Sequence, residues 1–298
     1  MKARKGIRLS VGGPGSGGGN MVGGSSTRVL GTGGVRIGTG RVTFRITRSG
    51  GQFLTAGVKE EPAKQETDAG NPGVSVITCT NRPENLEKVL ANYLRQNYSP
   101  RELIIVVNSE GIDMEAWRRR TAAHSDIKIL QLSSGQTLGE CLNYGVENAN
   151  YGYVAKCDDD DYYAPKYLSD LMPLFASTGA QIVGKCSMFV YFEGSQTLAI
   201  ALPGNENMPV GGVAGATMII SKEVFKQVKF TGTNFGEDSR FLEECVTRGI
   251  PIFSGDRFNF VCIRSNPDQH TWQVDETEYL KYCQIVAYTP DYISMITQ

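Results

Sequence analysis

Short apolar runs alternate with amphipathic stretches along the chain from Gly73 onward. Four runs rich in Val, Ile and Leu predict buried strands, at 74–78, 103–107, 127–130 and 153–155. The stretch between the first two runs repeats apolar side chains at helical spacing, at Leu86, Val89, Leu90, Tyr93 and Leu94. Strands that alternate with helices in this way are joined by right-handed crossovers into a mostly parallel sheet with flanking helices. The pattern therefore predicts an α/β fold of the Rossmann-like kind.

The pattern after residue 161 adds further elements. It predicts a helix at 166–176, a hairpin of strands at 188–192 and 197–202, a strand at 218–220 and a tyrosine-rich, helix-like stretch at 279–288. Another helix is expected to begin at Glu237-Asp238 and to end at Gly249, where glycine suits the left-handed helix terminus. Thr137 and Glu140 have the spacing of a capping box, which marks one more helix start.

Residues 1–72 have a different texture. They hold eighteen of the 35 glycines, and 1–27 is so rich in Gly and Ser that disorder is expected there. Within 28–58, apolar side chains alternate with basic and hydroxyl ones, which predicts a β-hairpin or meander unless this part is a poorly ordered tail. A charged, proline-bearing linker at 59–72 then leads into one domain at 73–298. The apolar and basic faces of the N-terminal segment suit self-association or attachment to a larger assembly.

The net charge of −1 conceals an asymmetry. Residues 1–58 carry nine Lys or Arg and no acid, whereas the rest of the chain carries 21 basic and 31 acidic residues. An acidic body argues against nucleic acid as a partner, because its phosphates need a basic surface. The seven cysteines are scattered without a C-x-x-C pair, which is typical of a reduced, cytoplasmic protein. No apolar run is long enough to span a bilayer, although docking at a membrane surface stays open.

Four consecutive aspartates, Asp158 to Asp161, follow the apolar run at 153–155. Adjacent carboxylates repel one another, and a divalent cation is the simplest group that neutralises them. In open α/β sheets, ligands bind outside the carboxyl ends of the strands, where this loop is expected to lie. The simpler interpretation is a solvated acidic turn before the helix at 166–176. The position at the end of a strand favours the metal site.

Four features in a fixed order make residues 73–272 resemble the family 2 glycosyltransferases, which are inverting enzymes of the GT-A fold. The features are the first strand with Thr80-Asn81-Arg82-Pro83, the run Asp158 to Asp161 followed by Pro165, the Gly215-Ala216-Thr217 strand with its following helix, and Glu237-Asp238 at a helix start. The resemblance implies a GT-A domain at 73–298. It also implies transfer of a sugar from a nucleoside-diphosphate sugar to the hydroxyl of a glycan, lipid-linked or protein acceptor.

The resemblance implies roles for individual acids. The family's Asp-x-Asp metal motif falls on Asp158 and Asp160, so Asp160 is the expected ligand of Mn²⁺ or Mg²⁺, while Asp158 supports the metal or contacts the ribose. Asp238 matches the general base that removes the proton of the acceptor hydroxyl. Neighbouring helix residues point about 100° apart, so Glu237 is expected to orient a neighbour instead. The simpler interpretation is that both acids only complement a helix N-terminus.

The resemblance places the nucleotide against the ends of the first two strands and the aspartate loop, at Thr78, Thr80, Asn81, Arg82, Asn108, Gln136, Asp158 and Asp159. A UDP-sugar is the expected donor. Relatives usually carry an aspartate where this chain has Asn108. The Asn108 oxygen can still accept the uracil imide proton, but without a charge, so the resemblance supports uridine as the base of the donor less strongly. Lys156 could approach a phosphate or pair with the acidic loop. His270 is a candidate metal ligand, against a structural role for a lone histidine, and Trp272 could line the acceptor cleft.

Two alternatives stay open. A sugar-nucleotidyltransferase would also bind metal and nucleotide on such a sheet, but it needs a glycine-rich phosphate loop after the first strand, and residues 78–83 contain no glycine. A non-catalytic binding or assembly protein would keep the domain as a scaffold. Acids retained at both the metal and the base positions argue against that alternative.

Overall fold

A computed structural model of the chain describes residues 28–37, 40–49, 52–60, 70–265 and 274–298, the first three of these ranges as strands only. The chain divides into two compact units, Met1–Ala69 and Gly70–Gln298. The expected disorder at 1–27 and most of the expected linker fall outside the described residues, as do His270 and Trp272.

The first unit contains three strands in the region where the sequence predicts a hairpin or meander. They are β1 (Arg28–Ile37), β2 (Gly40–Ser49) and β3 (Gln52–Glu60). Each pairs antiparallel with the next, in the order β1-β2-β3. In the register of β1 with β2, Val35 lies opposite Val42 and Arg36 opposite Arg41.

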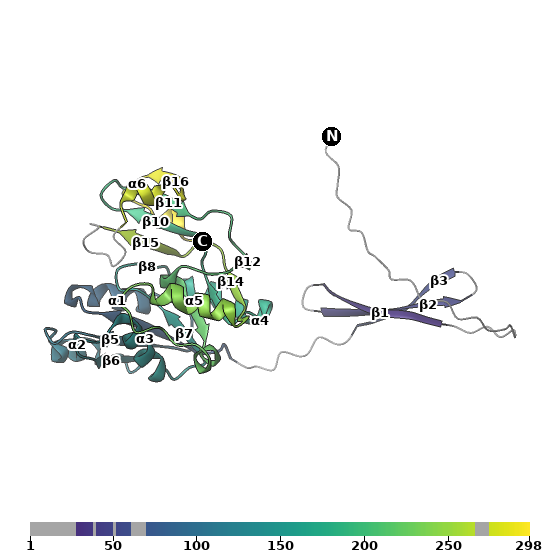
Figure 1. The fold of residues 1–298 in the computed structure, drawn as a ribbon, viewed down its shortest axis with the longest axis horizontal. Coiled ribbons are helices and arrows are strands. Elements are labelled where there is room, and N and C mark those ends of the chain that lie inside the picture. The colour runs from purple at the N-terminus through teal and green to yellow at the C-terminus, as the bar shows by residue number, and fades with distance from the viewer. Residues whose placement is uncertain (1–27, 38–39, 50–51, 61–69, 266–273) are drawn as a thin grey trace. The chain divides into compact units, whose positions relative to one another are not determined.

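The second unit is built on an eight-stranded sheet of order β12-β14-β9-β13-β7-β4-β5-β6 (Figure 1). Its strands are β4 (Val74–Thr80), β5 (Arg101–Val107), β6 (Ile127–Gln131), β7 (Tyr153–Lys156), β9 (Ile182–Gly184), β12 (Met208–Pro209), β13 (Ile219–Ser221) and β14 (Ile252–Ser254). β4 pairs parallel with both β5 and β7, β5 pairs parallel with β6, and β9 with β14. β13 runs antiparallel between β7 and β9. The predicted α/β fold with a mostly parallel sheet is confirmed.

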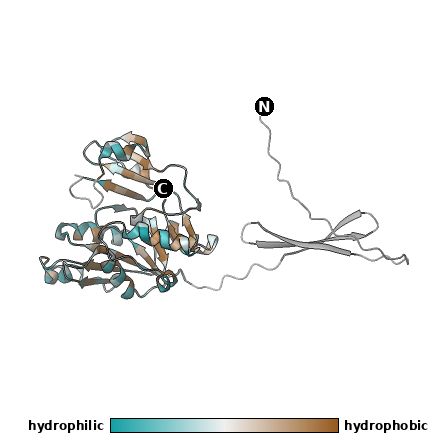
Figure 2. Ribbon diagram, in the orientation of Figure 1, coloured by the Kyte–Doolittle hydropathy of each residue, from teal (hydrophilic) through white to brown (hydrophobic). Residues whose placement is uncertain are grey.

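Helices cover both faces of this sheet. One face packs against α1 (Leu86–Leu94), α2 (Met114–Thr121) and α4 (Tyr167–Thr178), and the other against α3 (Leu138–Glu147) and α5 (Glu237–Thr247). Short 3-10 turns are η1 (Pro83–Asn85), η2 (Gly215–Thr217) and η3 (Lys222–Lys226). Apolar strands therefore lie between amphipathic helices (Figure 2), and burial of their Val, Ile and Leu side chains drives the packing of the three layers.

Two helix termini follow the sequence signals closely. Thr137 caps α3 in a full capping box, because its hydroxyl accepts the Glu140 N–H and the Glu140 carboxylate accepts the Thr137 N–H. Beyond the end of α5, Gly249 has a φ of 71°, which the absence of a Cβ atom permits. Both predicted helix boundaries are confirmed.

A second, five-stranded sheet has the order β16-β11-β10-β15-β8. It contains β8 (Tyr162–Tyr163), β10 (Met188–Phe192), β11 (Thr197–Ala201), β15 (Phe260–Arg264) and β16 (Cys283–Tyr288), with α6 (Glu276–Leu280) and α7 (Ile293–Ile296). The predicted hairpin is present, since β10 and β11 pair antiparallel with Val190 opposite Ala199. β8 follows the aspartate run directly, so this small sheet holds the far end of that loop.

Two sequence predictions are wrong. The stretch 279–288 is not a helix, because α6 ends at Leu280 and the next residues form β16, whose backbone pairs with β11. The β-branched Ile285 and Val286 favour the strand. Leu94, predicted on the buried face of α1, is 41% exposed, and that face instead contains the buried amide of Asn92. Among the described residues, no helix has the length and apolar character that a bilayer span requires.

Candidate active site

The carboxyl ends of β4, β5 and β7 meet at one edge of the large sheet, and the aspartate run lies there. β7 ends at Lys156, and Asp158 to Asp161 connect it to β8. Because β4 lies between β5 and β7 in the sheet, the residues that follow it can reach the loop. The position expected for a ligand site in an open α/β sheet is therefore occupied by four carboxylates.

Asp159 is fixed to the end of β4. Its carboxylate accepts hydrogen bonds from the Thr80 hydroxyl and from the Arg82 guanidinium, whose Nε lies 3.1 Å from Oδ2. Nη2 of Arg82 also lies 3.0 Å from Oδ2 of Asp160. Burial alone would lower the pKa of Arg82, but the charges of Asp159 and Asp160 outweigh it and raise that pKa. Asp159 is only 3% exposed, so it anchors the loop from beneath.

Asp161 fixes the other end of the loop. Its Oδ1 accepts the Ile263 N–H of β15 at 3.0 Å, and its carbonyl oxygen accepts the Asn92 amide of α1 at 2.9 Å. Lys88 donates to the Asp160 carbonyl at 3.1 Å. Burial, and then the charges of Asp160 and Asp158, raise the pKa of Asp161 well above its ordinary value. Asp159 and Asp161 thus hold the loop, and Asp158 and Asp160 have the more open carboxylates, with side chains 41% and 22% exposed.

Asp158 is paired with the lysine that ends β7. Nζ of Lys156 lies 2.7 Å from Oδ1 of Asp158, and the Lys156 side chain is only 4% exposed. Burial raises the pKa of Asp158, Lys156 acts against this, and the charges of Asp160 and Asp159 raise it further. Of the two roles considered for Lys156, the structure shows pairing with the acidic loop.

Two more acids, at the start of α5, act on the same ammonium group through their charges. Burial would lower the pKa of Lys156, but the charges of Asp158, Asp238 and Glu237, in that order, raise it above its usual value. Glu237 is 5% exposed, and its pKa is raised by burial and by Asp238 and lowered by Lys156. Asp158 and the pair at 237–238 are far apart in sequence, yet the fold brings them near enough to the buried Lys156 for their charges to raise its pKa.

Asp238 is the more open member of the α5 pair. Its Oδ1 accepts the Ser239 N–H at 2.7 Å. Its other oxygen lies against η2, where a Cβ atom built on Gly215 would be 2.7 Å from Cγ of Asp238. A half-buried carboxylate held on a helix and next to the aspartate loop can accept a proton from a group bound between them.

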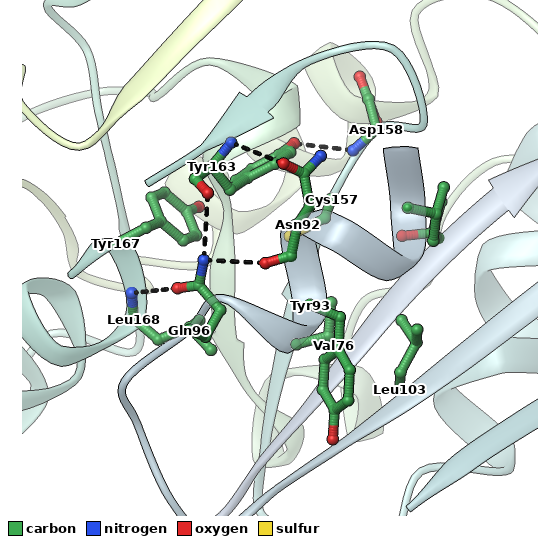
Figure 3. Close-up of a pocket in the computed structure, with 12 residues that line it drawn as sticks. Val76, Asn92, Tyr93, Gln96, Leu103, Cys157, Asp158, Tyr163, Tyr167 and Leu168 are labelled. Atoms are coloured by element: carbon green, nitrogen blue, oxygen red, sulfur yellow. Dashed lines mark hydrogen bonds between the residues drawn. The ribbon is translucent and has the colours of Figure 1, made fainter. Parts of the chain in front are cut away.

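The remaining donor-site candidates divide into two groups. Asn108 donates to the Thr80 carbonyl at 3.2 Å through its N–H and to the Gln136 carbonyl at 3.4 Å through its side chain, so Thr80, Asn108 and Gln136 meet at the edge of the sheet. Asn81 is exposed beside them. Thr78, in contrast, is 2% exposed and lines a small cavity. Asp158 and Tyr163 line the same cavity (Figure 3). The structure separates Thr78 from the open side of the site.

The acids fit a divalent cation in part. Among the described residues, no three His, Cys, Asp or Glu side chains converge as a ready-made metal site. Asp158 and Asp160 nonetheless present two partly exposed carboxylates at the rim of the loop. Mg²⁺ and Mn²⁺ are commonly held by one or two carboxylates together with phosphate oxygens of a substrate, and this loop offers that smaller set.

Sequence reasoning missed the residues that hold the loop in place. Tyr163 donates its hydroxyl to the Ala216 carbonyl and accepts the Asp158 N–H, both at 2.8 Å. Asn92, on α1, is buried and donates its side-chain amide to the Asp161 carbonyl. The tyrosine follows the aspartates directly, but nothing in a linear pattern shows that its hydroxyl turns back on them.

Comparisons with known proteins identify the family of this chain. The family described as "Glycosyl transferase family 2" matches residues 75–227, which is just over half of the 298-residue chain. A poly-beta-1,6-N-acetyl-D-glucosamine synthase of Staphylococcus aureus is 25% identical over 53% of this chain and 42% of its own length. The O-antigen biosynthesis glycosyltransferase WbnJ of Escherichia coli is 28% identical over 58% of this chain and 72% of its own length. The chain therefore spans less than half the length of the staphylococcal relatives it matches.

Solved structures show the same fold. Residues 1–349 of S. aureus TarS superpose with a TM-score of 0.52 and 17% identity, over 64% of this chain and 60% of that chain. The mannosyltransferase PcManGT of Pyrobaculum calidifontis, solved with GDP-Man and Mn²⁺, gives a TM-score of 0.53 and 16% identity, over 72% of this chain and 63% of that one. The expected GT-A fold is confirmed, and the match to the family shows that this chain belongs to glycosyl transferase family 2.

Proposed function

We propose that this chain is a metal-dependent, inverting glycosyltransferase that moves a sugar from a nucleoside-diphosphate sugar to a hydroxyl acceptor. The observation that carries the proposal is the link between the aspartate loop and the segment that touches Asp238. The Tyr163 hydroxyl bonds both the Asp158 N–H and the Ala216 carbonyl, and the neighbouring Gly215 lies against the Asp238 carboxylate. This link supports a site in which a donor-side loop and an acceptor-side base are held near each other. Family membership favours sugar transfer over nucleotidyl transfer and over a scaffold role.

Asp160 and Asp158 are the proposed metal ligands, with diphosphate oxygens of the donor completing the shell. When bound, Mn²⁺ or Mg²⁺ supplies positive charge that stabilises the departing nucleoside diphosphate. Arg82 keeps Asp159 buried and holds Asp160 at the rim, so the loop is organised before the donor arrives. His270 stays a candidate ligand outside the described residues.

Asp238 is the proposed general base. As the acceptor hydroxyl attacks the anomeric carbon, its proton passes to Oδ2 or Oδ1 of Asp238, a C–O bond forms, and the bond from the anomeric carbon to the diphosphate oxygen breaks. A single displacement of this kind inverts the anomeric configuration and needs one base. Asp238 is partly exposed while Glu237 is buried, which supports Asp238 as that base and Glu237 as a support for Lys156.

The proposed donor pocket is the open side of the edge formed by Asn81, Arg82, Asn108 and Gln136, with the buried Thr80 in a supporting role through its bond to Asp159. A UDP-sugar is the first donor to test, because the Asn108 oxygen can accept the imide proton of uracil. TarS has been solved with UDP-GlcNAc and PcManGT with GDP-Man, so these two nucleotide-sugars define a short panel. The acceptor is proposed to be a glycan, a lipid-linked sugar or a protein hydroxyl. All seven cysteines are free thiols, which suits the proposed cytoplasmic location.

The test combines binding and turnover. Melting temperature is measured with UDP, GDP, UDP-GlcNAc and GDP-Man, with and without Mn²⁺, and release of nucleoside diphosphate is measured with the two nucleotide-sugars. Asp160→Asn should abolish the metal-dependent rise in melting temperature. Asp238→Asn should keep that rise but lose about 100-fold or more in kcat. Glu244→Gln, which changes an exposed acid of the same helix, is the matched control and should behave as the natural chain.

The stereochemical part is tested on the product. NMR of the glycoside formed from an α-linked donor should show a β-linkage. An α-linked product, or full activity in Asp238→Asn, would contradict the proposed mechanism, and no stabilisation by any nucleotide would contradict the donor site.

A further inference from the structure

The hydroxyl of Tyr163 joins two parts of the site that come from different regions of the chain. It accepts the backbone N–H of Asp158 at 2.8 Å and donates to the backbone carbonyl of Ala216 at 2.8 Å. Asp158 begins the aspartate loop, and Ala216 is the middle residue of η2. Figure 3 shows the first of these bonds crossing from the Tyr163 ring to the start of the loop. One side-chain atom therefore spans from the loop to η2.

The Tyr163 side chain has little freedom to move. Its ring centroid lies 5.0 Å from that of Tyr167 and 5.1 Å from that of Phe260, and the residue is 2% exposed. Its backbone is tied to α1, because Tyr163 N–H donates to Asn92 Oδ1 at 3.2 Å and its carbonyl accepts the Gln96 amide at 3.3 Å. The hydroxyl of a ring held in this way has a fixed position. It therefore fixes the two backbone groups that are bonded to it, the Asp158 N–H and the Ala216 carbonyl.

η2 is equally well fixed on its other side. The hydroxyl of Thr217, which is fully buried, donates to the Ala214 carbonyl at 2.8 Å and accepts the Lys185 N–H at 2.9 Å. Gly215, the first residue of η2, lies directly against the carboxylate of Asp238. A shift of η2 would therefore move the Asp238 carboxylate, and a shift of the loop would move Asp158.

We infer that Tyr163 is a positioning residue that sets the distance between the donor-side loop and the acceptor-side base. This inference rests on the roles proposed above for Asp158 and Asp238. Attack on the anomeric carbon requires the acceptor oxygen, held by the base, to lie in line with the departing diphosphate, held by the loop. Misplacement of reacting groups by about 1 Å can cost on the order of 100-fold in rate. Tyr163 touches neither reactant and acts through Asp158 and, by way of η2, through Asp238.

The variant Tyr163→Phe removes the hydroxyl and keeps the ring. The structure offers a close control in Tyr167→Phe, since Tyr167 lies in the same aromatic cluster, is 1% exposed, and its hydroxyl has no hydrogen-bond partner among the described residues. A second control, Tyr98→Phe, removes one hydroxyl bond to a backbone carbonyl, that of Pro72, away from the site. The two controls thereby separate the effect of losing any tyrosine hydroxyl from the effect of losing the hydroxyl of Tyr163.

The first measurement is amide hydrogen exchange of the unliganded protein. In Tyr163→Phe, exchange should become faster by about tenfold in peptides covering 157–162 and in peptides covering 214–218, because one atom serves both segments. Tyr167→Phe and Tyr98→Phe should leave both segments unchanged. If neither segment responds, or if only one does, Tyr163 does not couple them and the inference is overturned. The hydrogen-exchange measurement needs no donor, so it tests the coupling between the two segments even if the proposed function is wrong.

The second measurement is steady-state release of nucleoside diphosphate from UDP-GlcNAc and GDP-Man with Mn²⁺. In Tyr163→Phe, kcat per folded molecule should fall by about 10- to 100-fold, while the KM for the donor changes by less than about threefold. A kcat within twofold of that of Tyr167→Phe, or an effect confined to KM, would reject the positioning role. Absence of turnover in the natural chain with every donor would instead count against the proposed function.

Discussion

Gly215 leaves no room for a side chain next to Asp238. A Cβ atom at Gly215 would lie 2.7 Å from Cγ of Asp238 and would overlap its Oδ2. The neighbours of this glycine are fixed by the bonds of Thr217 and Tyr163, so η2 cannot easily retreat. The carboxylate proposed as the base therefore occupies the space that a side chain at position 215 would fill.

Gly215→Ala should push the Asp238 carboxylate out of its position. We expect kcat for nucleoside-diphosphate release to fall by about 10- to 100-fold, because the base no longer reaches the acceptor oxygen in line. Metal-dependent stabilisation by the nucleotide should persist, since the aspartate loop is untouched. Gly211→Ala is the control, because a Cβ atom there meets nothing within 4 Å. Equal kcat values in the two variants would refute the contact as a determinant of rate.

Protonation of the Glu102 carboxylate should make the protein less stable in acid. This β5 carboxylate is 4% exposed and accepts bonds from Ser75 Oγ at 2.6 Å, from Asn150 N–H at 2.6 Å and from Lys128 Nζ at 2.9 Å. Burial alone would raise its pKa, but these donors together lower it below the ordinary value. A carboxyl group with a lowered pKa in the folded state stabilises the fold above its unfolded pKa of about 4.3, and this stability is lost as pH falls through the folded value.

The corresponding variant is Glu102→Gln. At pH 7 its free energy of unfolding should be lower by about 1–3 kcal/mol. The difference from the natural chain should shrink as pH falls from about 6 to about 3, because the natural chain loses the same charge. Urea unfolding at several pH values measures this difference. Glu115→Gln, at an acid whose side chain is 68% exposed, should change little, and a gap for Glu102→Gln that stays constant with pH would contradict the prediction.

Arg82→Ala should lower the free energy of unfolding by more than a variant that breaks an ordinary surface ion pair. Asp159 is 3% exposed and would keep only the Thr80 hydroxyl as a partner among the bonds described for it. We expect a loss of about 1–3 kcal/mol in unfolding free energy, because a buried carboxylate would lose its charged donor. Arg120→Ala, which breaks an exposed pair with Glu87, should cost far less, because solvent screens that pair. Thermal or urea unfolding of both variants makes the comparison, and equal losses would show that burial of Asp159 does not matter.

How far the sequence predicts this molecule depends on the range of the interactions involved. The four aspartates after β7 and the acids at the start of α5 are visible because each depends on neighbours within a few residues. The same holds for the Thr137 capping box, which closes within one helical turn. The contact of Gly215 with Asp238 joins segments about twenty residues apart, and no local pattern encodes it.

β16 is an element whose type the sequence predicts wrongly. Residues 283–288 have no strict alternation of apolar and polar side chains, and they follow the helix that ends at Leu280, so the local pattern predicts that the helix continues. Tertiary pairing with β11 decided the outcome, with Ile285 opposite Ala199 in the register. Edge strands that lean on one neighbour carry a weaker pattern than strands buried on both sides, because fewer of their side chains are covered.

Lys156→Met should make the protein less stable at neutral pH. The Lys156 side chain is 4% exposed and its ammonium lies 2.7 Å from Oδ1 of Asp158, so its removal leaves that carboxylate without a charged donor. We expect the free energy of unfolding at pH 7 to fall by about 1–3 kcal/mol, because a hydrogen bond between charged groups is lost next to the core. Urea unfolding measures the change. Lys229→Met, which breaks an exposed pair with Glu147, is the control and should change the stability little. Equal losses in the two variants would show that the burial of Lys156 does not matter.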